Sequence, residues 1–395
     1  MASASPGSEP PIPRTVWALG FVSMFMDISS ETIHALLPLF LTGTLGVSVA
    51  MVGLIDGVAE STASIAKLFS GYVSDRIGKR KPLILIGYGL GALTKPLFAL
   101  AGSASLVIAA RFADRIGKGL RGAPRDALVA DVTPIEIRGR AFGLRQSLDT
   151  AGALIGPLVA IGLMFVFANN IRSVFWIATI PAIIAVLLVL LFVSEPQSPK
   201  PTSAARSPIA FADLKRLPRA FWLLTMVGSI FTLARFSEAF LILKASAEGL
   251  PLALAPVVLV VMNAVYVIGA YPAGAMADRF AARTLLSIGM ACLIMADLAL
   301  ALLPSLTGAF IGIALWGAHM ALTQGLLTKL VADNAPPELR GSAYGFFNFG
   351  TGIALLFASL IAGIVWDRFG AETTFLVGAG FAVVALGALW AIERP

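Results

Sequence analysis

The sequence contains few charged residues and few of the side chains on which enzyme active sites are usually built. Asp, Glu, Lys and Arg make up 13% of its 395 residues, which is about half the share found in soluble domains. Two histidines and a single cysteine, Cys292, exclude a disulfide framework and a cysteine-based metal cluster. No Gly-Lys-Ser or Gly-Lys-Thr phosphate-binding loop is present. We therefore expect no enzymatic activity, no ATP-driven step and no cofactor.

Long apolar stretches make up most of the chain. Hydrophobic residues account for 58% of it, and the mean hydropathy is +0.88. A membrane-spanning helix needs about 20 mostly apolar residues, and such stretches recur from end to end. The net charge of +7 does not cluster on a soluble face, so nucleic acid is not an expected partner. The composition predicts an all-α membrane protein whose surroundings are the lipid bilayer.

Twelve spans are predicted, and a polar, Pro-rich stretch divides them into two groups of six. The predicted domains are a cytoplasmic tail at 1–14, a six-helix domain at 15–193, a cytoplasmic linker at 194–218 and a second six-helix domain at 219–395. The predicted spans are 15–42, 48–70, 82–101, 104–130, 141–167, 173–193, 219–243, 251–275, 284–303, 307–332, 342–366 and 372–392.

The basic residues outside these spans predict the orientation of the chain. Nearly all of them fall on the side of the two termini, and only Arg172, Lys244 and Arg368 fall on the opposite side. Cytoplasmic loops are the ones enriched in Lys and Arg. We expect a multi-pass protein of the inner (plasma) membrane with both termini in the cytoplasm, acting as a monomer.

The two predicted halves repeat each other. The segment 71–76, GYVSDR, recurs as GAMADR at 274–279. The pattern of Asp, Pro, Arg-Gly, Ala and Gly within 131–143 recurs within 333–345 at nearly the same offset. Two separate matches at one offset indicate a duplicated six-helix unit.

With these motifs the chain resembles the major facilitator superfamily over its whole length. The loop signature is Gly71-x-x-x-Asp75-Arg76-x-Gly78-Lys79-Arg80, and its degenerate partner is Asp278-Arg279. Arg111 matches the superfamily's span-four arginine, and Gly152-x-x-x-Gly156-Pro157 resembles the span-five motif of exporters that exchange substrate for protons. The resemblance implies two pseudo-symmetric six-helix halves around a central cavity, and secondary transport of a small molecule.

Several of these motif residues are expected to act in gating. Asp75 can bind a helix N-terminus or a basic residue across the halves when the inner side is closed, although the basic loop residues also serve topology alone. Gly152 and Gly156 share one helix face and allow another helix to approach closely, while Pro157 kinks span five. The predicted gating residues are Gly71, Asp75, Arg76, Gly78, Lys79, Arg80, Asp131, Asp278, Arg279, Gly152, Gly156 and Pro157.

Charged residues within the spans are costly in lipid and therefore indicate a site. In spans one, two and four they lie on one side of each helix, at 100° per residue. The resemblance places spans one and four against the central cavity and span two against the opposite half. The predicted proton-coupling or substrate-binding residues are Asp27, Glu31, His34, Asp56, Glu60, Arg111, Asp114, Arg115, Lys118, Arg145, Asp149, Arg235 and Glu238.

These charges also allow a purely structural interpretation, in which acids and bases pair and set the helix register. That interpretation suits Arg125, Asp126 and Lys329, which lie near span ends. Arg235 and Glu238 are expected to pair with each other. The neutral candidates for substrate contact are Asn263, Tyr266, Gln324 and Asn348, and the aromatic candidates, which helix packing explains equally well, are Trp316, Phe346, Phe347 and Phe349.

The leading functional hypothesis is proton-coupled export of a small amphiphilic or anionic organic compound. Arg115 and Lys118 stand where small residues are common in the superfamily, which favours an anionic group on the substrate. Proton symport for uptake, export of a divalent metal by Asp27, Glu31 and His34, and a non-transporting receptor remain alternatives. Because one helix rarely supplies a whole metal site, we expect no bound metal.

The loop motif generates a first prediction. Asp75→Asn should slow transport, because the amide cannot stabilise the inward-closed state as the carboxylate does. Substrate affinity should stay nearly unchanged. Transport rates and equilibrium binding measured on the same preparation check this, and a loss of affinity equal to the loss of rate would contradict the gating role.

Overall fold

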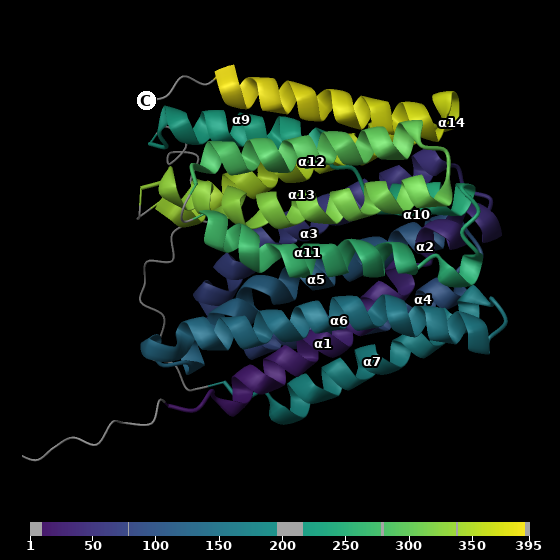
Figure 1. Cartoon of the computed structure of the whole chain (residues 1–395). Coiled ribbons are helices and arrows are strands. Elements are labelled where there is room, and N and C mark those ends of the chain that lie inside the picture. Colours follow the sequence, from purple (N-terminus) through teal and green to yellow (C-terminus); the bar gives the residue numbers. More distant parts are fainter. Residues whose placement is uncertain (1–9, 78, 196–215, 278–279, 337–338, 392–395) are drawn as a thin grey trace, which may run out of the picture.

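The chain folds into a bundle of long helices. The computed structural model describes residues 10–77, 79–195, 216–277, 280–336 and 339–391, and within these ranges the regular secondary structure is helical throughout (Figure 1). The first group of helices comprises α1 (Arg14–His34), α2 (Leu37–Leu39), η1 (Phe40–Thr44), α3 (Val49–Ile77), α4 (Lys81–Leu100), α5 (Ala104–Val132), η2 (Ile135–Ile137), α6 (Arg138–Val166) and α7 (Ile171–Phe192).

The second group follows the stretch 196–215. It comprises α9 (Arg219–Leu233), α10 (Ala239–Ala247), η3 (Leu252–Leu254), α11 (Val257–Ala277), α12 (Ala282–Leu302), α13 (Leu306–Asp333) and α14 (Arg340–Ala391). Gly370 divides α14 into two passes, because its φ of +89° lies in a region that favours glycine. The predicted linker lies mostly outside the described residues, and the domain boundaries remain a prediction.

The described residues make twelve passes across the bundle, which confirms the predicted fold class. α1, α2 and η1 form one pass, α9 and α10 form another, and α14 supplies two. By length and composition, eight helices could span a membrane, α14 among them. The three passes made by α1, α5 and the α9–α10 pair fall outside that set. α5 is rich in charge, and α9 has only 15 residues.

One predicted boundary is wrong at the loop motif. The predicted second span ends at residue 70, whereas α3 continues to Ile77. Gly71 therefore lies on the last turns of a helix and does not open a loop. The first and last described residues, Pro10 and Ala391, lie on the same side of the bundle, which we call the terminal side (left in Figure 1). The opposite side is the distal side.

The helices pack in two groups that meet at two main interfaces. In the first group α1 packs on α6 and α7, and α5 packs on α3 and α4. In the second group α12 packs on α13 and α14, and α11 packs on α13. Between the groups, α3 packs on α14 and α6 on α11.

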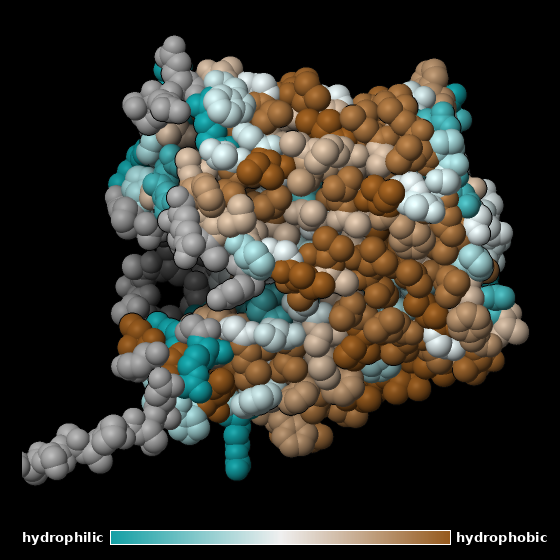
Figure 2. Space-filling model, in the orientation of Figure 1, coloured by the Kyte–Doolittle hydropathy of each residue, from teal (hydrophilic) through white to brown (hydrophobic). Residues whose placement is uncertain are grey.

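The outside of the bundle is apolar. Large hydrophobic side chains are exposed on it, among them Leu93 (73% exposed), Ile268 (75%) and Phe165 (64%). Figure 2 shows this apolar surface as a broad brown band along the helices. Exposed apolar side chains of this size and number are compatible with lipid rather than water around the bundle. The protein is therefore a multi-pass membrane protein.

α3 and α14 close the distal side of the bundle. A Cβ atom added at Gly53 would lie 2.1 Å from the Ser359 carbonyl oxygen, and one added at Gly363 would lie 2.5 Å from Ala50 Cα. Asp367 of α14 accepts hydrogen bonds from the backbone N–H groups of Val49 (3.0 Å) and Ala50 (2.9 Å) at the start of α3. These N–H groups have no intrahelical partner, and a carboxylate is favourable at a helix N-terminus.

This contact generates a second prediction. Asp367→Ala should weaken the distal closure by about 1 kcal/mol, or roughly fivefold in the ratio of closed to open molecules. Spin labels at Ser105 and Thr373, in a chain carrying Cys292→Ser, report the distal distance by double electron–electron resonance. A longer distance should become more populated.

The matched control is Glu372→Ala, which removes an exposed carboxylate at the same end of the bundle. The described residues show no hydrogen bond or ion pair for it. Unchanged distance distributions in the Asp367→Ala variant would contradict the closing role of this residue.

Candidate functional site

Two adjoining cavities lie between the two groups of helices. The first has a volume of ≈ 260 Å³ and the second ≈ 300 Å³, and Glu31 and Lys118 line both. Figure 2 shows the surface hollowed at the terminal side between the groups. The first is lined by Glu31, His34, Asp56, Glu60, Arg115, Lys118, Arg235, Phe236, Ser237, Glu238, Trp316, Met320, Leu355 and Ser359. The second is lined by Asp27, Glu31, Lys67, Lys118, Arg121, Gly122, Arg125, Gln146, Asp149, Thr150, Ala153, Asn263, Tyr266 and Val267.

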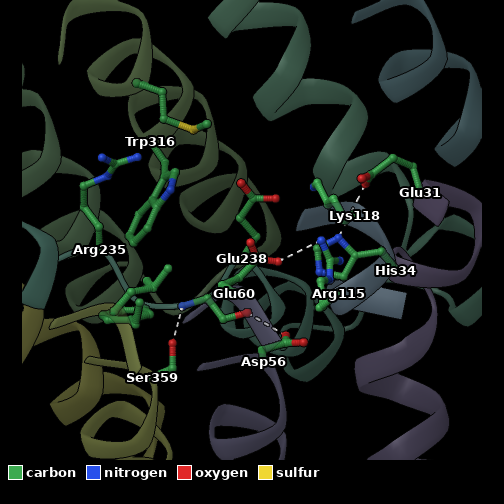
Figure 3. A pocket seen from close by; sticks show the side chains of 14 residues that line it. Glu31, His34, Asp56, Glu60, Arg115, Lys118, Arg235, Glu238, Trp316 and Ser359 are labelled. Atoms are coloured by element: carbon green, nitrogen blue, oxygen red, sulfur yellow. Dashed lines mark hydrogen bonds and ion pairs between the residues drawn. The ribbon is translucent and has the colours of Figure 1, made fainter. Parts of the chain in front are cut away.

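The charged side chains from the first group of helices mostly pair with one another in the first cavity. Arg115 Nη1 lies 3.1 Å from Glu60 Oε1, which joins α5 to α3, and His34 Nδ1 lies 3.4 Å from Glu31 Oε2 on α1 (Figure 3). The charged faces predicted for spans one, two and four therefore meet at this cavity. Pairing lowers the cost of burying each charge.

Arg111 and Asp56 form a buried pair that reaches the second group of helices. Arg111 Nη2 donates to Asp56 Oδ1 at 3.2 Å, and the two residues are 2% and 4% exposed. The other carboxylate oxygen of Asp56 accepts from Ser237 Oγ at 2.7 Å, and the Ser237 backbone N–H donates to Ser359 Oγ at 3.2 Å. This chain of bonds links α3, α5, α14 and the segment between α9 and α10.

Asp114, another predicted site residue, lines neither of these cavities. Its carboxylate lies 2.8 Å from Lys95 Nζ, and the same ammonium donates to Ser30 Oγ at 2.9 Å. Both charged residues are almost completely buried. The pair joins α4 to α5 and also reaches α1, so its position is that of a structural ion pair.

Asp27 and Asp149 meet in the second cavity. The side chains of these two residues, on α1 and α6, lie near enough to each other for a hydrogen bond when one of the carboxyl groups is protonated. Asp149 also lies 3.5 Å from Arg125 Nη1 and 3.7 Å from Arg145 Nη1. A hydrogen bond between two carboxyl groups requires one proton, so the pair is suited to holding a single proton.

The span-five glycines bring these two helices together. A Cβ atom at Gly152 would lie 2.5 Å from the Met24 carbonyl oxygen, and one at Gly156 would lie 2.7 Å from Glu31 Cβ. Only residues without a side chain allow α1 and α6 to approach so closely. Pro157 lies within α6, directly after this contact.

Span seven is interrupted beside the first cavity. α9 ends at Leu233 and α10 begins at Ala239, and the five residues between them include Arg235 and Glu238. The expected ion pair between Arg235 and Glu238 is absent from the described residues. Because the helix stops between α9 and α10, the three-residue spacing no longer places the two side chains together.

Five of the twelve predicted gating residues lie wholly or by their side chains outside what the structure describes. Gly78, Asp278 and Arg279 fall outside the described residues, as do the side chains of Asp75 and Arg76. Arg80 lies 3.4 Å from Asp131, within the first group of helices, and Lys79 is exposed. The inner latch remains a prediction.

Some of the neutral and aromatic residues predicted to contact substrate line the cavities, and others do not. Asn263 and Tyr266 line the second cavity, and Trp316 lines the first. Gln324 and Asn348 line neither. Phe346 contacts Trp222, Phe347 packs against Gly228, and Phe349 is exposed, which indicates helix packing and bilayer contact.

Sequence reasoning missed several lining residues. Ser237 and Ser359 carried no signal, because single serines are common in spans and only the tertiary contact makes them informative. Lys67, Arg121 and Arg125 were visible as charges in spans but were not placed in the site. The interruption of span seven has neither Pro nor Gly to mark it, since its residues are Ala-Arg-Phe-Ser-Glu.

The divalent-metal alternative receives no support from the geometry. Asp27 lies with Asp149 in the second cavity, while Glu31 lies with His34. The described residues contain no group of three His, Cys, Asp or Glu side chains arranged to hold a metal ion.

A helical bundle with adjoining charged cavities between two six-pass groups is typical of membrane transporters. The family model of the Major Facilitator Superfamily matches residues 19–358, and a second match covers 246–395. The chain belongs to the Major Facilitator Superfamily, as the sequence motifs predict.

Two relatives and one solved structure illustrate the similarity. An MFS-type transporter of Methanocaldococcus jannaschii is 31% identical over 379 residues, covering 94% of this chain and 93% of that protein. The class H tetracycline resistance protein of Pasteurella multocida is 30% identical over 328 residues, covering 75% and 76%. A variant of the nucleoside transporter NupG superposes with a TM-score of 0.80 at 16% identity, covering 96% of this chain and all of that one.

The contact between α1 and α6 generates a third prediction. Gly156→Val should destabilise the protein by about 1–3 kcal/mol, because the new side chain collides with α1. Thermal unfolding of the detergent-solubilised protein measures this. Gly162→Val, on the same helix with nothing within 4 Å of its Cβ position, is the matched control. Equal unfolding temperatures in the two variants would contradict the close contact.

Proposed function

We propose that this protein exports a small amphiphilic or anionic organic compound in exchange for protons. The terminal side would face the cytoplasm, as the distribution of basic residues favours. In that orientation the distal side is closed and the cavities face inward. The single observation that carries the proposal is the pair of carboxyl groups, Asp27 and Asp149, in a cavity that adjoins a second one.

The carboxyl pair is the proposed proton site. Arg125 Nη1 and Arg145 Nη1 lie 3.5 Å and 3.7 Å from Asp149, whereas the described residues show no ion pair for Asp27. Both acids line the second cavity, so the proton can exchange with the water of that cavity. Asp27 is therefore the proposed proton carrier and Asp149 its anionic partner.

The first cavity is the proposed substrate site. On the side of the second group of helices, its wall contains the apolar side chains Phe236, Trp316, Met320 and Leu355. On the opposite side it presents charged residues of α1, α3 and α5. One apolar and one charged wall suit a compound with an apolar body and a polar group.

Glu31 and Lys118 are the proposed coupling residues, because they line both cavities. The charge of Lys118 acts on Asp27 and Asp149 in one cavity and on Glu31 and Glu60 in the other. Binding of substrate beside Lys118 would change the charge balance at the carboxyl pair. Occupancy of the substrate site and protonation of the carboxyl pair would then depend on each other, as coupled transport requires.

Arg111 has a different role in this scheme from the one expected. The sequence predicts a proton-coupling or substrate-binding residue at this position, whereas Arg111 binds Asp56 and lines neither cavity. Asp56 in turn holds Ser237 of the second group of helices. This contact forms only while α3 and α14 close the distal side. Arg111 is therefore proposed to position Asp56 for closure.

Two findings support export over uptake. The Gly152–Pro157 motif at the contact of α1 and α6 resembles that of proton-exchanging exporters. A relative covering 75% of the chain is named a tetracycline resistance protein. Uptake by symport would use the same cavities. A transport assay therefore distinguishes export from uptake.

The carboxyl pair generates a fourth prediction. In energised everted membrane vesicles, the wild type should accumulate its substrate, found by a thermal-shift screen of organic anions and amphiphiles. A protonophore should abolish the accumulation. Asp27→Asn should still exchange substrate across the membrane but should not concentrate it, because the amide carries no exchangeable proton.

Glu372→Gln, which removes an exposed carboxylate outside both cavities, is the control and should concentrate substrate normally. If Asp27→Asn, Glu31→Gln and the double variant all concentrate substrate as the wild type does, the proposed proton-carrying role is contradicted. The charged residues of α1 would then serve only as structural partners of α5. Accumulation in right-side-out vesicles alone would reverse the proposed direction.

A further inference from the structure

The interruption of span seven leaves two opposite charges in the first cavity without an ion-pair partner. Arg235 and Glu238 lie between the end of α9 and the start of α10, and both line the cavity. No ion pair within 4.0 Å involves either residue among the described parts of the chain. The other acids of this cavity, Glu31, Asp56 and Glu60, each lie beside a basic side chain.

Arg235 is half-buried and has an unsatisfied donor. Its Cζ lies 5.7 Å from the centroid of the Phe231 ring. Its Nε atom is buried and has no hydrogen-bond partner among the described residues. Burying such a donor unpaired costs free energy, which a ligand with an acceptor group recovers on binding.

Glu238 faces the acids of the first group of helices. The charged groups that act on it are His34, Glu31, Glu60 and Arg235. Figure 3 shows the Glu238 and Glu60 side chains pointing into the same part of the cavity. Like charges gathered around one space favour a cation within it. This part of the cavity is suited to an ammonium group.

Arg235 lies at another part of the same wall. In Figure 3 the Trp316 ring lies between the Arg235 and Glu238 side chains. The cavity thus has an acidic part at Glu238, a basic part at Arg235 and an aromatic surface at Trp316. Lys118 also lines this cavity, and its charge acts on Glu31 and Glu60 and on the carboxyl pair of the second cavity.

We propose that the first cavity binds a zwitterionic organic molecule, with its carboxylate on Arg235, its ammonium at Glu238 and its apolar side chain on Trp316. This rests on the proposed function for the transport of the ligand, but not for its binding. The volume of ≈ 260 Å³ lies just below the about 300–1,000 Å³ of pockets for drug-sized ligands. The ligand is therefore the size of an aromatic amino acid or a small conjugate of one.

The arrangement should discriminate strongly between charge types. A ligand lacking the ammonium leaves Glu238 unpaired beside other carboxylates, and a ligand lacking the carboxylate leaves Arg235 unpaired. A hydrogen bond to a charged group contributes about 1.5–3 kcal/mol, so each loss should weaken binding roughly tenfold to a hundredfold. Both charges of one molecule are needed for full affinity.

Three naphthalene compounds with the same ring test this on the detergent-solubilised full chain. They are 3-(2-naphthyl)alanine, which is zwitterionic, 3-(2-naphthyl)propionate, which is anionic, and 2-(2-naphthyl)ethylamine, which is cationic. Isothermal titration calorimetry should show saturable binding of the zwitterion at millimolar concentrations or below. The two singly charged compounds should bind at least about tenfold more weakly.

Two variants and their controls assign the charges to residues. Arg235→Gln should reduce the affinity for the zwitterion to that for the amine, and Glu238→Gln should reduce it to that for the propionate. Arg283→Gln is the matched control for Arg235, because it removes a guanidinium stacked on an aromatic ring (Trp390, 4.2 Å) outside both cavities. Glu372→Gln is the control for Glu238, and neither control should change binding.

The proposal is overturned by any of three results. The first is equal or tighter binding of a singly charged compound, the second is absence of saturable zwitterion binding at millimolar concentrations, and the third is unchanged affinity in both site variants. Loss of proton coupling in the vesicle assay with intact zwitterion binding would instead refute the proposed export alone. The proposal of zwitterion binding and the proposal of proton-coupled export can therefore be refuted independently of each other.

Discussion

The cost of burying charge in an apolar bundle governs the whole arrangement. Charged side chains at membrane depth need partners or water, and here the first group of helices supplies most of its own. Arg111 with Asp56, Arg115 with Glu60 and Lys95 with Asp114 each join two different helices. A pair of this kind fixes the rotation of both helices, because turning either one would leave a charge alone in a low dielectric. The charged faces therefore define the cavity wall and hold it in place.

Glycines determine where helices approach closely enough for those charges to act. At Gly152 and Gly156 the contact of α1 with α6 brings Asp27 beside Asp149. At Gly53 and Gly363 the contact of α3 with α14 closes the distal side and brings Asp56 to Ser237. One contact lies within a six-pass group, while the other lies between the groups, where the proposed transport would require it to break. Small residues thus serve both rigidity and movement.

The two groups contribute unequally to the cavities. The first brings paired charges and the proposed proton site, and the second brings an aromatic wall and two charges without partners. Interrupting span seven makes this possible, because a break exposes side chains and backbone groups toward a cavity where they can be solvated. In the proposed function, the adjoining cavities would let a proton and a substrate influence each other through shared residues. They need not compete for one carboxylate.

The sequence alone determined the fold class, the family and the polar faces of spans one, two and four. The length of the apolar stretches, the duplicated motifs and the helical periodicity are all properties of the local sequence. They can therefore be recognised without a structure. Only the tertiary structure decided which charges meet. Arg111 binds Asp56 and not Asp27, Asp114 turns to Lys95, and Arg235 and Glu238 stay apart because an unmarked break separates them. Partner choice depends on the relative rotation and depth of helices far apart in the chain. Side-chain packing sets those quantities, and no local pattern records them.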